Sequence, residues 1–256
     1  MNMGKIIGDS VRYPLSNWKN FLILGIIFVI SSLYLDVGQL GANTVIIGIL
    51  GVIGFIVGLL SDGYTLRIIK SSLADFEELP EFNAWVDMFI DGIKVFIVSI
   101  VYLIPAILII AFAALSFGSA LIGIISHPSS APSAAEVGAI LNVGILILIA
   151  ALYMVIILPI AAIATANMAY YESKLSAAFR LGEIFNKIGN IGWLNFILWY
   201  IATGIIYLVI LIIGSIITGF FNIINPIIGG LILSLIVIPY TTIFVIRSVA
   251  LVYKSE

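Results

Sequence analysis

The sequence predicts an all-α integral membrane protein in which six transmembrane helices form three hairpins, each preceded by a cytoplasmic interfacial amphipathic helix. The first supporting observation is the composition: of 256 residues, 62% are hydrophobic and 9% are charged, whereas an ordinary soluble domain has about 25% charged residues. The second is the spacing of the charges, which leaves long uncharged runs. The third is the distribution of lysine and arginine. Together they predict one six-span membrane domain over residues 1–256.

The uncharged runs define the spans, because a charge at the bilayer centre costs at least ~2.5 kcal/mol. The run from Lys187 to Arg247 is too long for one crossing of ~20 residues, and it is interrupted around Pro226, so it predicts two helices. The predicted spans are residues 21–35, 44–60, 95–125, 137–168, 193–219 and 227–246. The first is short enough to resemble the apolar part of a signal peptide, but no small-residue cleavage site follows it.

The cations predict the orientation of the spans. All eleven lysines and arginines lie before the first span, between the second and third, between the fourth and fifth, or after the sixth. The remaining loops, residues 36–43, 126–136 and 220–226, contain neither residue type. Because lysine and arginine gather in cytoplasmic loops, this asymmetry predicts a multi-pass protein of the cell membrane with both termini in the cytoplasm.

Three cytoplasmic segments, residues 5–19, 81–94 and 173–188, each place apolar residues on one helical face and charged residues on the other. Such helices typically lie in the membrane interface, so membrane lipid is the expected partner. The predicted aromatic anchors are Trp18, Trp85, Phe89 and Phe185. Packing of the same apolar faces against the helix bundle is an open alternative.

Small and helix-bending residues occur within the spans. Glycines recur every three to four residues along the second span, which lets another backbone approach closely. The predicted packing face consists of Gly48, Gly51, Gly54 and Gly58. Prolines bend helices because they lack an N–H and clash with the preceding turn. The predicted hinges are Pro105, Pro159 and Pro239.

The residue types exclude several classes of function. The chain has no cysteine and one histidine, which removes disulfides and the usual zinc ligands, and we predict no metal site, no cofactor and no catalytic residues. The net charge of -2 argues against binding to nucleic acid. No ionisable residue lies in the middle of a span, which argues against ion-coupled transport and proton relays.

Two features of the chain leave a binding or transport function open. The acidic segment 75–81 lies on the predicted cytoplasmic side and could attract a basic protein partner, although runs of this kind are more often solvated turns. Uncharged polar residues within the spans, such as Tyr153, Thr203 and Tyr240, could line a path for an apolar or amphiphilic solute in a permease or exporter. Hydrogen bonds between helices explain the same residues without a ligand.

Residues 62–67, Asp-Gly-Tyr-Thr-Leu-Arg, resemble the Asp-Gly-x-x-Ala-Arg opening of the CDP-alcohol lipid head-group transferases. Farther on, Asp87 and Asp91 stand one helical turn apart, a spacing that suits Mg²⁺ ligands. The resemblance then ends, because Leu66 replaces the alanine and Phe76 replaces the next glycine. A lipid-modifying enzyme is therefore the most distant interpretation.

Residues 62–94 also resemble a known family. Gly-Tyr at 63–64, Leu-Pro-Glu at 79–81 and Asp-Gly-x-Lys at 91–94 are together similar to the mostly archaeal membrane family called domain of unknown function 4013. The resemblance implies a multi-pass membrane protein with no established activity. In layout the chain is also loosely similar to the membrane region of membrane-anchored glycerophosphodiester phosphodiesterases, whose catalytic barrel has no counterpart here.

We therefore expect a non-enzymatic multi-pass membrane protein that organises lipid or a partner protein at the cytoplasmic face. A permease or exporter for an apolar or amphiphilic solute is the alternative. A scaffold predicts a closed bundle without a polar cavity, a permease predicts a cavity lined by the tyrosines and threonines of the spans, and an enzyme predicts converging carboxylates.

Overall fold

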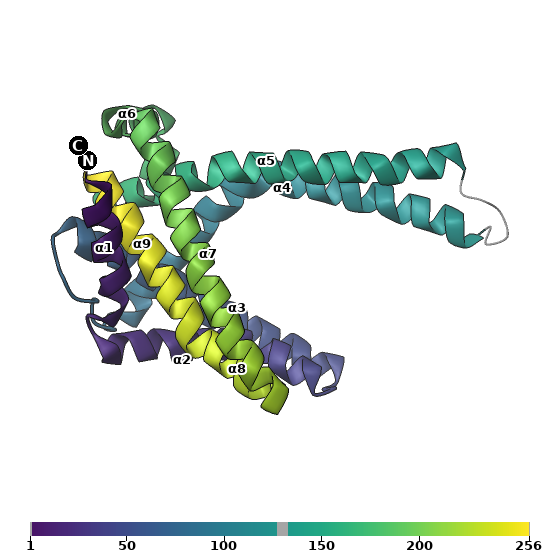
Figure 1. The fold of residues 1–256 in the computed structure, drawn as a ribbon, viewed down its shortest axis with the longest axis horizontal. Helices are drawn as coiled ribbons and strands as arrows, with labels where there is room; N and C mark the ends of the chain where they lie inside the picture. Colours follow the sequence, from purple (N-terminus) through teal and green to yellow (C-terminus); the bar gives the residue numbers. More distant parts are fainter. Residues whose placement is uncertain (1, 127–132, 256) are drawn as a thin grey trace. The chain divides into compact units, whose positions relative to one another are not determined.

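The protein is described by a computed structural model that covers residues 2–126 and 133–255. Within these residues the chain is helical, and six helices are long and apolar enough to cross a membrane (Figure 1). They are α2 (Trp18–Gln39), α3 (Thr44–Leu73), α4 (Trp85–Ser126), α5 (Ala134–Tyr170), α7 (Trp193–Ile224), and a last helix formed by α8 (Pro226–Ile232), the π-helical segment η3 (Leu233–Val237) and α9 (Ile238–Lys254). The predicted set of six apolar helices is confirmed.

Asparagine side chains begin several of the helices. The side chain of Asn17 accepts the N–H of Asn20 at 3.1 Å and starts α2, and that of Asn43 accepts the N–H of Val45 at 2.7 Å and starts α3. Such caps satisfy N–H groups that the helix itself leaves unpaired. Helix α2 has 22 residues and a length of about 33 Å at ~1.5 Å per residue, which is more than the predicted span of residues 21–35 provides.

Helix boundaries differ among the three predicted interfacial segments. The first contains α1 (Met3–Arg12) and η1 (Tyr13–Leu15), and the third contains η2 (Leu175–Phe179) and α6 (Leu181–Ile191). Gly192, with φ of +88°, separates α6 from α7. By contrast, residues 85–94 continue into the third span as the single helix α4. An amphipathic pattern predicts which side of a helix is apolar, but it does not predict where the helix ends. A helix ends at a helix-breaking residue such as Gly192, and in residues 85–94 no residue interrupts the helix.

The chain divides into two compact units. The first comprises Met1–Phe96 and Ala162–Glu256, and the second comprises Ile97–Ala161. The core of the first unit joins α2, α3 and α9 to the loop between α3 and α4. Its buried side chains are Tyr13, Phe21, Leu24, Tyr64, Ile68, Leu79, Met88 and Ile243. In this unit α1 packs against α9, which brings the two ends of the chain together (Figure 1).

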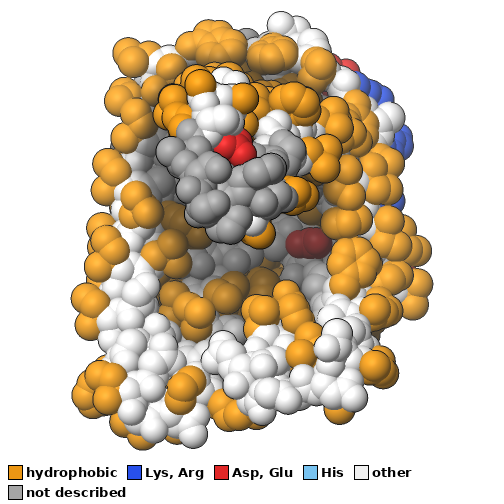
Figure 2. All heavy atoms as spheres, turned by 90° about the vertical axis from the view of Figure 1, so that its right-hand side faces the viewer, with side chains coloured by type: hydrophobic (Ala, Val, Ile, Leu, Met, Phe, Trp, Pro, Cys, Tyr) orange, Lys and Arg blue, Asp and Glu red, His pale blue; other side chains and the backbone are white. Residues whose placement is uncertain are grey.

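The second unit consists of parts of α4 and α5, which run antiparallel to each other (Figure 1). The Tyr153 hydroxyl donates to the carbonyl of Tyr102 at 2.8 Å. Small side chains, Ala106, Ala113 and Ala150, are buried, as is typical where membrane helices pack closely. Large apolar side chains such as Phe112 are exposed, and Figure 2 shows many hydrophobic side chains on the face of the protein that it presents. An apolar solvent suits such a surface.

Candidate functional site

The loop between α3 and α4, residues 74–84, is hereafter called the strap, and it contains the acidic segment 75–81. Asp75 and Ala84 near its two ends have positive φ values of 65° and 49°, a conformation that non-glycine residues adopt uncommonly. Leu79 at its centre is 3% exposed and belongs to the core of the first unit. The strap is therefore anchored in its middle by Leu79 and turns sharply near both ends.

Side chains from other segments bind the backbone of the strap, mainly at its carbonyl oxygens. The Tyr13 hydroxyl donates to the carbonyl of Glu78 at 2.8 Å, and Asn20 Nδ2 donates to that of Leu79 at 3.2 Å. The further donors are Tyr64 Oη to Pro80 (2.7 Å), Arg67 Nη1 to Glu81 (2.9 Å) and Asn83 (2.7 Å), and Arg247 Nη1 to Phe76 (2.8 Å). Each bond adds stability and restricts the path of the backbone.

Arg247 connects the strap to both ends of the chain. It lies on α9 and is 4% exposed. Its Nε bonds Asp9 Oδ1 of α1 at 2.7 Å, and its guanidinium lies 4.2 Å from the centre of the Tyr13 ring. A planar guanidinium can serve a carboxylate, a carbonyl and a ring at once, which an ammonium does less well. Burial, the largest influence, raises the pKa of the Tyr13 hydroxyl, so this group stays a neutral donor.

A close crossing of α3 and α4 lies next to the strap. A Cβ atom built on Gly63 would stand 1.7 Å from the carbonyl oxygen of Met88, and one built on Gly92 would stand 1.8 Å from that of Leu59. The two backbones therefore touch where glycine lacks a side chain. Beside the crossing the ring of Tyr64 stacks on Phe82 of the strap, with 3.9 Å between ring centres.

Asp91, which directly precedes Gly92, anchors a small ionic cluster. Its Oδ2 accepts from Lys70 Nζ at 3.0 Å and from Ser173 Oγ at 2.8 Å, while its Oδ1 accepts from Lys94 Nζ at 3.0 Å. Its side chain is 16% exposed. Two ammonium groups on one carboxylate occupy both oxygens, so Asp91 links α3, α4 and the turn that follows α5.

Three glutamate side chains of the strap are exposed to solvent, whereas its backbone carbonyls are hydrogen-bonded to neighbouring segments. Glu77, Glu78 and Glu81 are exposed. Asp75 pairs with Lys254 at the end of α9, and this hydrogen bond, followed by the charge of the lysine, lowers the pKa of the aspartate. The strap thus presents acidic side chains to solvent from a backbone that neighbouring elements hold in place.

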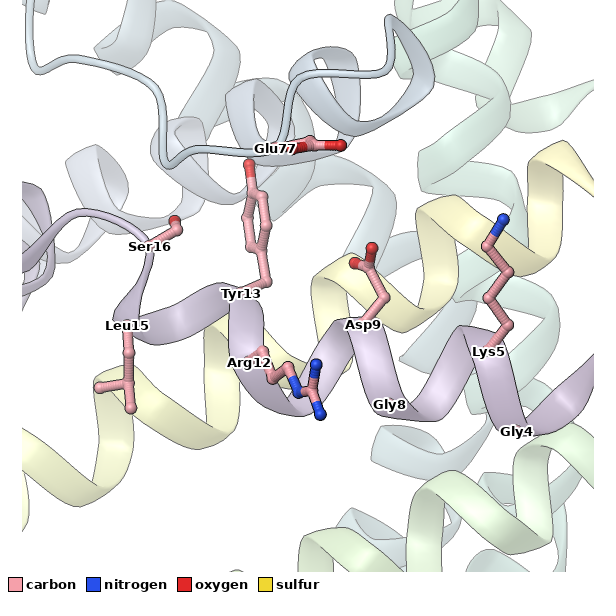
Figure 3. A pocket seen from close by; sticks show the side chains of 9 residues that line it. All are labelled: Gly4, Lys5, Gly8, Asp9, Arg12, Tyr13, Leu15, Ser16 and Glu77. Atoms are coloured by element: carbon pink, nitrogen blue, oxygen red, sulfur yellow. The ribbon is translucent and has the colours of Figure 1, made fainter.

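A groove of about 630 Å³ runs between α1 and the strap. Gly4, Gly8, Lys5, Asp9 and Glu77 are among the residues that line it. Figure 3 shows the side chains of Lys5 and Asp9 on the side of α1 that faces Glu77. The groove therefore carries charges of both signs, and one strap carboxylate lies at its edge.

Three of the predicted interfacial anchors are strongly exposed: Trp18 by 55%, Trp85 by 46% and Phe185 by 42%. Phe89 is half-buried. Trp18 begins α2 and stacks on Phe21, with ring centres 5.2 Å apart. Trp85 begins α4 and lies beside Phe82 at 5.6 Å. The anchors thus lie at helix starts or on α6, and each of the tryptophans touches another ring.

The predicted glycine face of the second span divides into two parts. A Cβ atom built on Gly54 would stand 2.5 Å from the carbonyl oxygen of Ser31 in α2, and one on Gly58 would stand 3.8 Å from Ser31 Oγ. Nothing lies within 4 Å of such an atom on Gly48 or Gly51. Close backbone approach therefore occurs at Gly54, while Gly58 makes an ordinary van der Waals contact.

The predicted hinges lie in different surroundings. Pro105 and Pro159 lie inside the continuous helices α4 and α5. Pro239 follows the π-helical segment η3 and is the second residue of α9. Proline at 239 cannot donate to the carbonyl of Leu235 as an α-helical residue would, and this oxygen would stand 2.3 Å from a Cβ atom on Gly25. The irregular turn therefore faces a close contact with α2.

The carboxylates considered as metal ligands have separate surroundings. Asp91 is engaged by two lysines and a serine, as described above, and Asp87 is exposed in the first turn of α4. Asp62 lies on α3, one residue before the crossing glycine. In the part of the chain that the structure describes, no group of three or more histidine, cysteine, aspartate or glutamate side chains is arranged to hold a metal ion.

Sequence reasoning missed the residues that hold the strap. Arg247 carried a usable signal, because α9 continues through apolar residues after it to Lys254, and a charge followed by apolar helix tends to lie inside a protein. Tyr13 and Asn20 carried no comparable signal, since their partners are backbone atoms more than fifty residues away in the sequence.

Six helices of this length and composition are those of a multi-pass membrane protein. Residues 46–219, more than half of the chain, match the family described as “Protein of unknown function (DUF4013)”, and the chain belongs to this family. The Uncharacterized protein MJ1189 of Methanocaldococcus jannaschii is 26% identical over 162 residues, which are 62% of this chain and 50% of that protein. The chain thus spans about half the length of this relative. No solved structure matches this chain.

Proposed function

We propose that this protein is a non-enzymatic membrane scaffold that docks a lysine- or arginine-rich segment of a partner protein on the strap. The observation that carries the proposal is the contrast within the strap. Its carbonyls are bound by side chains of neighbouring segments, whereas Glu77, Glu78 and Glu81 are exposed. Carboxylates on a backbone that is already fixed lose little conformational entropy when a partner binds. Their negative electrostatic potential attracts basic segments.

The proposal includes the membrane arrangement: three hairpins, interfacial helices that contact lipid, and a cytoplasmic strap. Two ion pairs support this arrangement: Asp9 pairs with Arg247, and Asp75 pairs with Lys254. Each pair joins two segments that are predicted to lie on the cytoplasmic side. The test is labelling of Ser133→Cys and Ser255→Cys with an impermeant thiol reagent in intact and in opened cells. We expect labelling of position 133 in intact cells and of position 255 in opened cells alone. Labelling of both in intact cells would contradict this orientation.

Internal hydrogen bonds of the spans favour a scaffold over a permease. Thr203 Oγ1 and Ser248 Oγ lie 3.1 Å apart, and Trp199 Nε1 donates to the same serine at 2.7 Å. The Tyr240 hydroxyl donates to the carbonyl of Val11 at 2.8 Å. These polar groups are engaged with the protein itself, as a closed bundle requires.

The docking proposal is tested by peptide binding to the full-length protein in nanodiscs of uncharged lipid. A fluorescent twelve-residue peptide rich in lysine and arginine is titrated at low and at moderate salt, and its anisotropy is measured. We expect the triple variant Glu77→Gln, Glu78→Gln, Glu81→Gln to bind at least about tenfold more weakly, because each lost charge pair weakens attraction. Binding should also fall with added salt, which screens exposed charges.

Two further variants separate charge from geometry. Glu172→Gln also removes an exposed carboxylate, but outside the strap, and it should change the affinity less than twofold. Tyr64→Phe keeps every charge but removes the hydroxyl that holds the carbonyl of Pro80, and it should weaken binding about threefold. Equal affinities of the parent and the triple variant would exclude the strap as the docking surface.

A further inference from the structure

The groove between α1 and the strap, hereafter the α1 groove, is large enough for a small ligand. Its volume of about 630 Å³ falls within the usual range of ligand pockets, about 300–1,000 Å³. Its lining residues come from α1, from η1 and the residue after it, and from the strap, which contributes Glu77. In Figure 3 the side chains of Lys5 and Asp9 extend from α1 to the side on which Glu77 lies. A ligand in the groove therefore touches two segments that lie far apart in the sequence.

Charges of opposite sign line the α1 groove without pairing with each other. Lys5, Arg12 and Glu77 are exposed, and in the described part of the chain none of these side chains takes part in an ion pair or a hydrogen bond. Asp9, in contrast, is engaged by Arg247. The groove thus offers available cations on α1 and an available carboxylate on the strap, which suits a ligand that carries both an anionic and a cationic group.

The backbone around Glu77 is hydrogen-bonded on both sides. The carbonyl of the preceding residue accepts from Arg247 Nη1 at 2.8 Å. The carbonyl of the following residue accepts from the Tyr13 hydroxyl, also at 2.8 Å. Helix α1 is held in turn by its packing against α9. A ligand therefore orders only the ends of the charged side chains, because the backbones that carry them are already fixed.

Gly8, in the middle of α1, leaves part of this space open. Glycine destabilises a helix interior relative to alanine, and at Gly63 its presence is explained by the backbone of α4, which would lie 1.7 Å from a Cβ atom. Nothing lies within 4 Å of a Cβ atom built on Gly8, so no packing contact within the described residues requires glycine there. The absence of a side chain at this position enlarges the α1 groove, which Gly8 lines.

Apolar side chains lie beside one end of the α1 groove. Leu15 lines the groove, and in Figure 3 it lies at the opposite end from Lys5. Leu15 and nearby Trp18 are both exposed, and tryptophan is typical of the head-group level of a membrane. An amphiphile can therefore place a charged head group in the groove and its apolar part beside Leu15 and Trp18.

We propose that the α1 groove binds a zwitterionic head group such as phosphoethanolamine, with the phosphate at Lys5 and the ammonium at Glu77. Ammonium groups only donate hydrogen bonds and carboxylates only accept them, so the two charges fix the orientation of the head group. Charge-assisted hydrogen bonds of both kinds are short and strong. The source is a phospholipid or a soluble phosphoethanolamine ester. The inference goes beyond the docking proposal and does not rest on it, because Lys5 has no part in the docking surface.

The test uses the full-length protein in an uncharged detergent, with its melting temperature measured against increasing ligand. The probes are dihexanoyl phosphatidylethanolamine, dihexanoyl phosphatidylglycerol, which has the phosphate but no ammonium, and glycerophosphoethanolamine, which has no acyl chains. We expect phosphatidylethanolamine to bind about fivefold more tightly than phosphatidylglycerol, as the loss of one exposed charge pair predicts. Equal apparent Kd values for the two phospholipids would overturn the proposal. Binding of glycerophosphoethanolamine with a similar Kd would support a soluble ester as the source, and its failure to bind would support a phospholipid.

Matched variants assign the binding to the α1 groove. Lys5→Gln and Glu77→Gln should each raise the apparent Kd for phosphatidylethanolamine about fivefold. Lys19→Gln and Glu81→Gln remove one exposed charge of each sign outside the lining, and each should change this Kd less than about twofold, because salt screens charges outside the groove. Gly8→Leu retains every charge but fills the groove, and it should raise the Kd more than about tenfold. It should not lower the melting temperature of the free protein, because leucine favours the helix.

Two further results would show that the proposal is wrong. One is an equal Kd in Lys5→Gln and Lys19→Gln, and the other is binding by Gly8→Leu as tight as by the parent. The failure of this proposal is distinguishable from that of the docking proposal. Lys5→Gln should weaken the binding of phosphatidylethanolamine and leave the basic peptide of the docking test bound as tightly as before.

Discussion

Gly63→Ala is the smallest substitution that should disrupt the architecture around the strap. Its added Cβ atom would stand 1.7 Å from the carbonyl oxygen of Met88, whereas ordinary contacts begin at 3.4 Å. The atom in the way belongs to the backbone of α4, so no rotamer change can relieve the overlap. The two helices would have to separate by about 1.7 Å, and this would loosen the stacking of Tyr64 on Phe82.

The expected cost follows from two opposing effects. Overpacking in a rigid interior typically costs 1–3 kcal/mol and occasionally more, and a backbone-to-backbone clash belongs at the upper end, at about 3 kcal/mol. Replacing glycine by alanine inside a helix gains about 1 kcal/mol where there is space. Gly48 provides that reference, because it lies in the same helix and nothing stands within 4 Å of its built Cβ atom. The two alanine variants should therefore differ by about 4 kcal/mol.

The assay is thermal unfolding of the full-length variants in one detergent, monitored by the loss of helical circular dichroism. A difference of this size corresponds to roughly 10 °C for a chain of this length. Gly63→Ala should melt below the parent and Gly48→Ala at or slightly above it. Proteolysis within the strap should be faster in Gly63→Ala alone. If the two variants melted within about 2 °C of each other, α3 and α4 would not cross at these glycines.

Two further predictions concern the ends of the chain. Arg247→Gln should lower the free energy of unfolding by about 2 to 3 kcal/mol, because it leaves Asp9 and the Phe76 carbonyl without their buried partner. The control is Arg12→Gln, which changes an exposed arginine and should change the free energy of unfolding by less than about 0.5 kcal/mol. Equal denaturant midpoints for the two variants would contradict this prediction. Because the pKa of Asp75 is lowered by Lys254, this pair stabilises the fold above the ordinary aspartate pKa of about 3.9 and ceases to do so as pH falls through the lowered value. Melting between pH 3 and 6 should therefore depend on pH less steeply in Lys254→Gln than in the parent, and identical slopes would argue against the pair.

The number and rough position of the apolar helices could be predicted from the sequence because charge placement in a membrane is costly and therefore sharply patterned. Helix ends were less predictable. The predicted second span stops at residue 60, whereas α3 continues past Asp62 to Leu73. Arg67 and Lys70 in this last part of the helix bind the strap carbonyls and Asp91, respectively. A charge ends an apolar run in the sequence without ending the helix.

The sequence predicts that the strap is acidic, but it does not predict the hydrogen bonds that fix the backbone of the strap. Donors to its backbone come from η1, α2, α3 and α9, and such contacts have no local sequence signature. The glycine stripe shows the same limit: spacing identified Gly54, while the closest approaches involve Gly63 and Gly92, which follow aspartates in two Asp-Gly pairs. Those pairs belong to the resemblance with the DUF4013 family, and in this chain they mark where two helix backbones touch.

The donors that hold the strap divide according to the family match. Tyr64 and Arg67 lie within residues 46–219, which match the family, and they bind the carbonyls of Pro80, Glu81 and Asn83 in the second half of the strap. Tyr13, Asn20 and Arg247 lie outside these residues, and they bind the first half, from Phe76 to Leu79. Since α1 and α9 also contact each other, the first half of the strap takes its shape only when both ends of the chain are folded onto it. On the proposal that the strap docks a partner, the presentation of Glu77 and Glu78 depends on η1, α2 and α9, which hold this half of the strap.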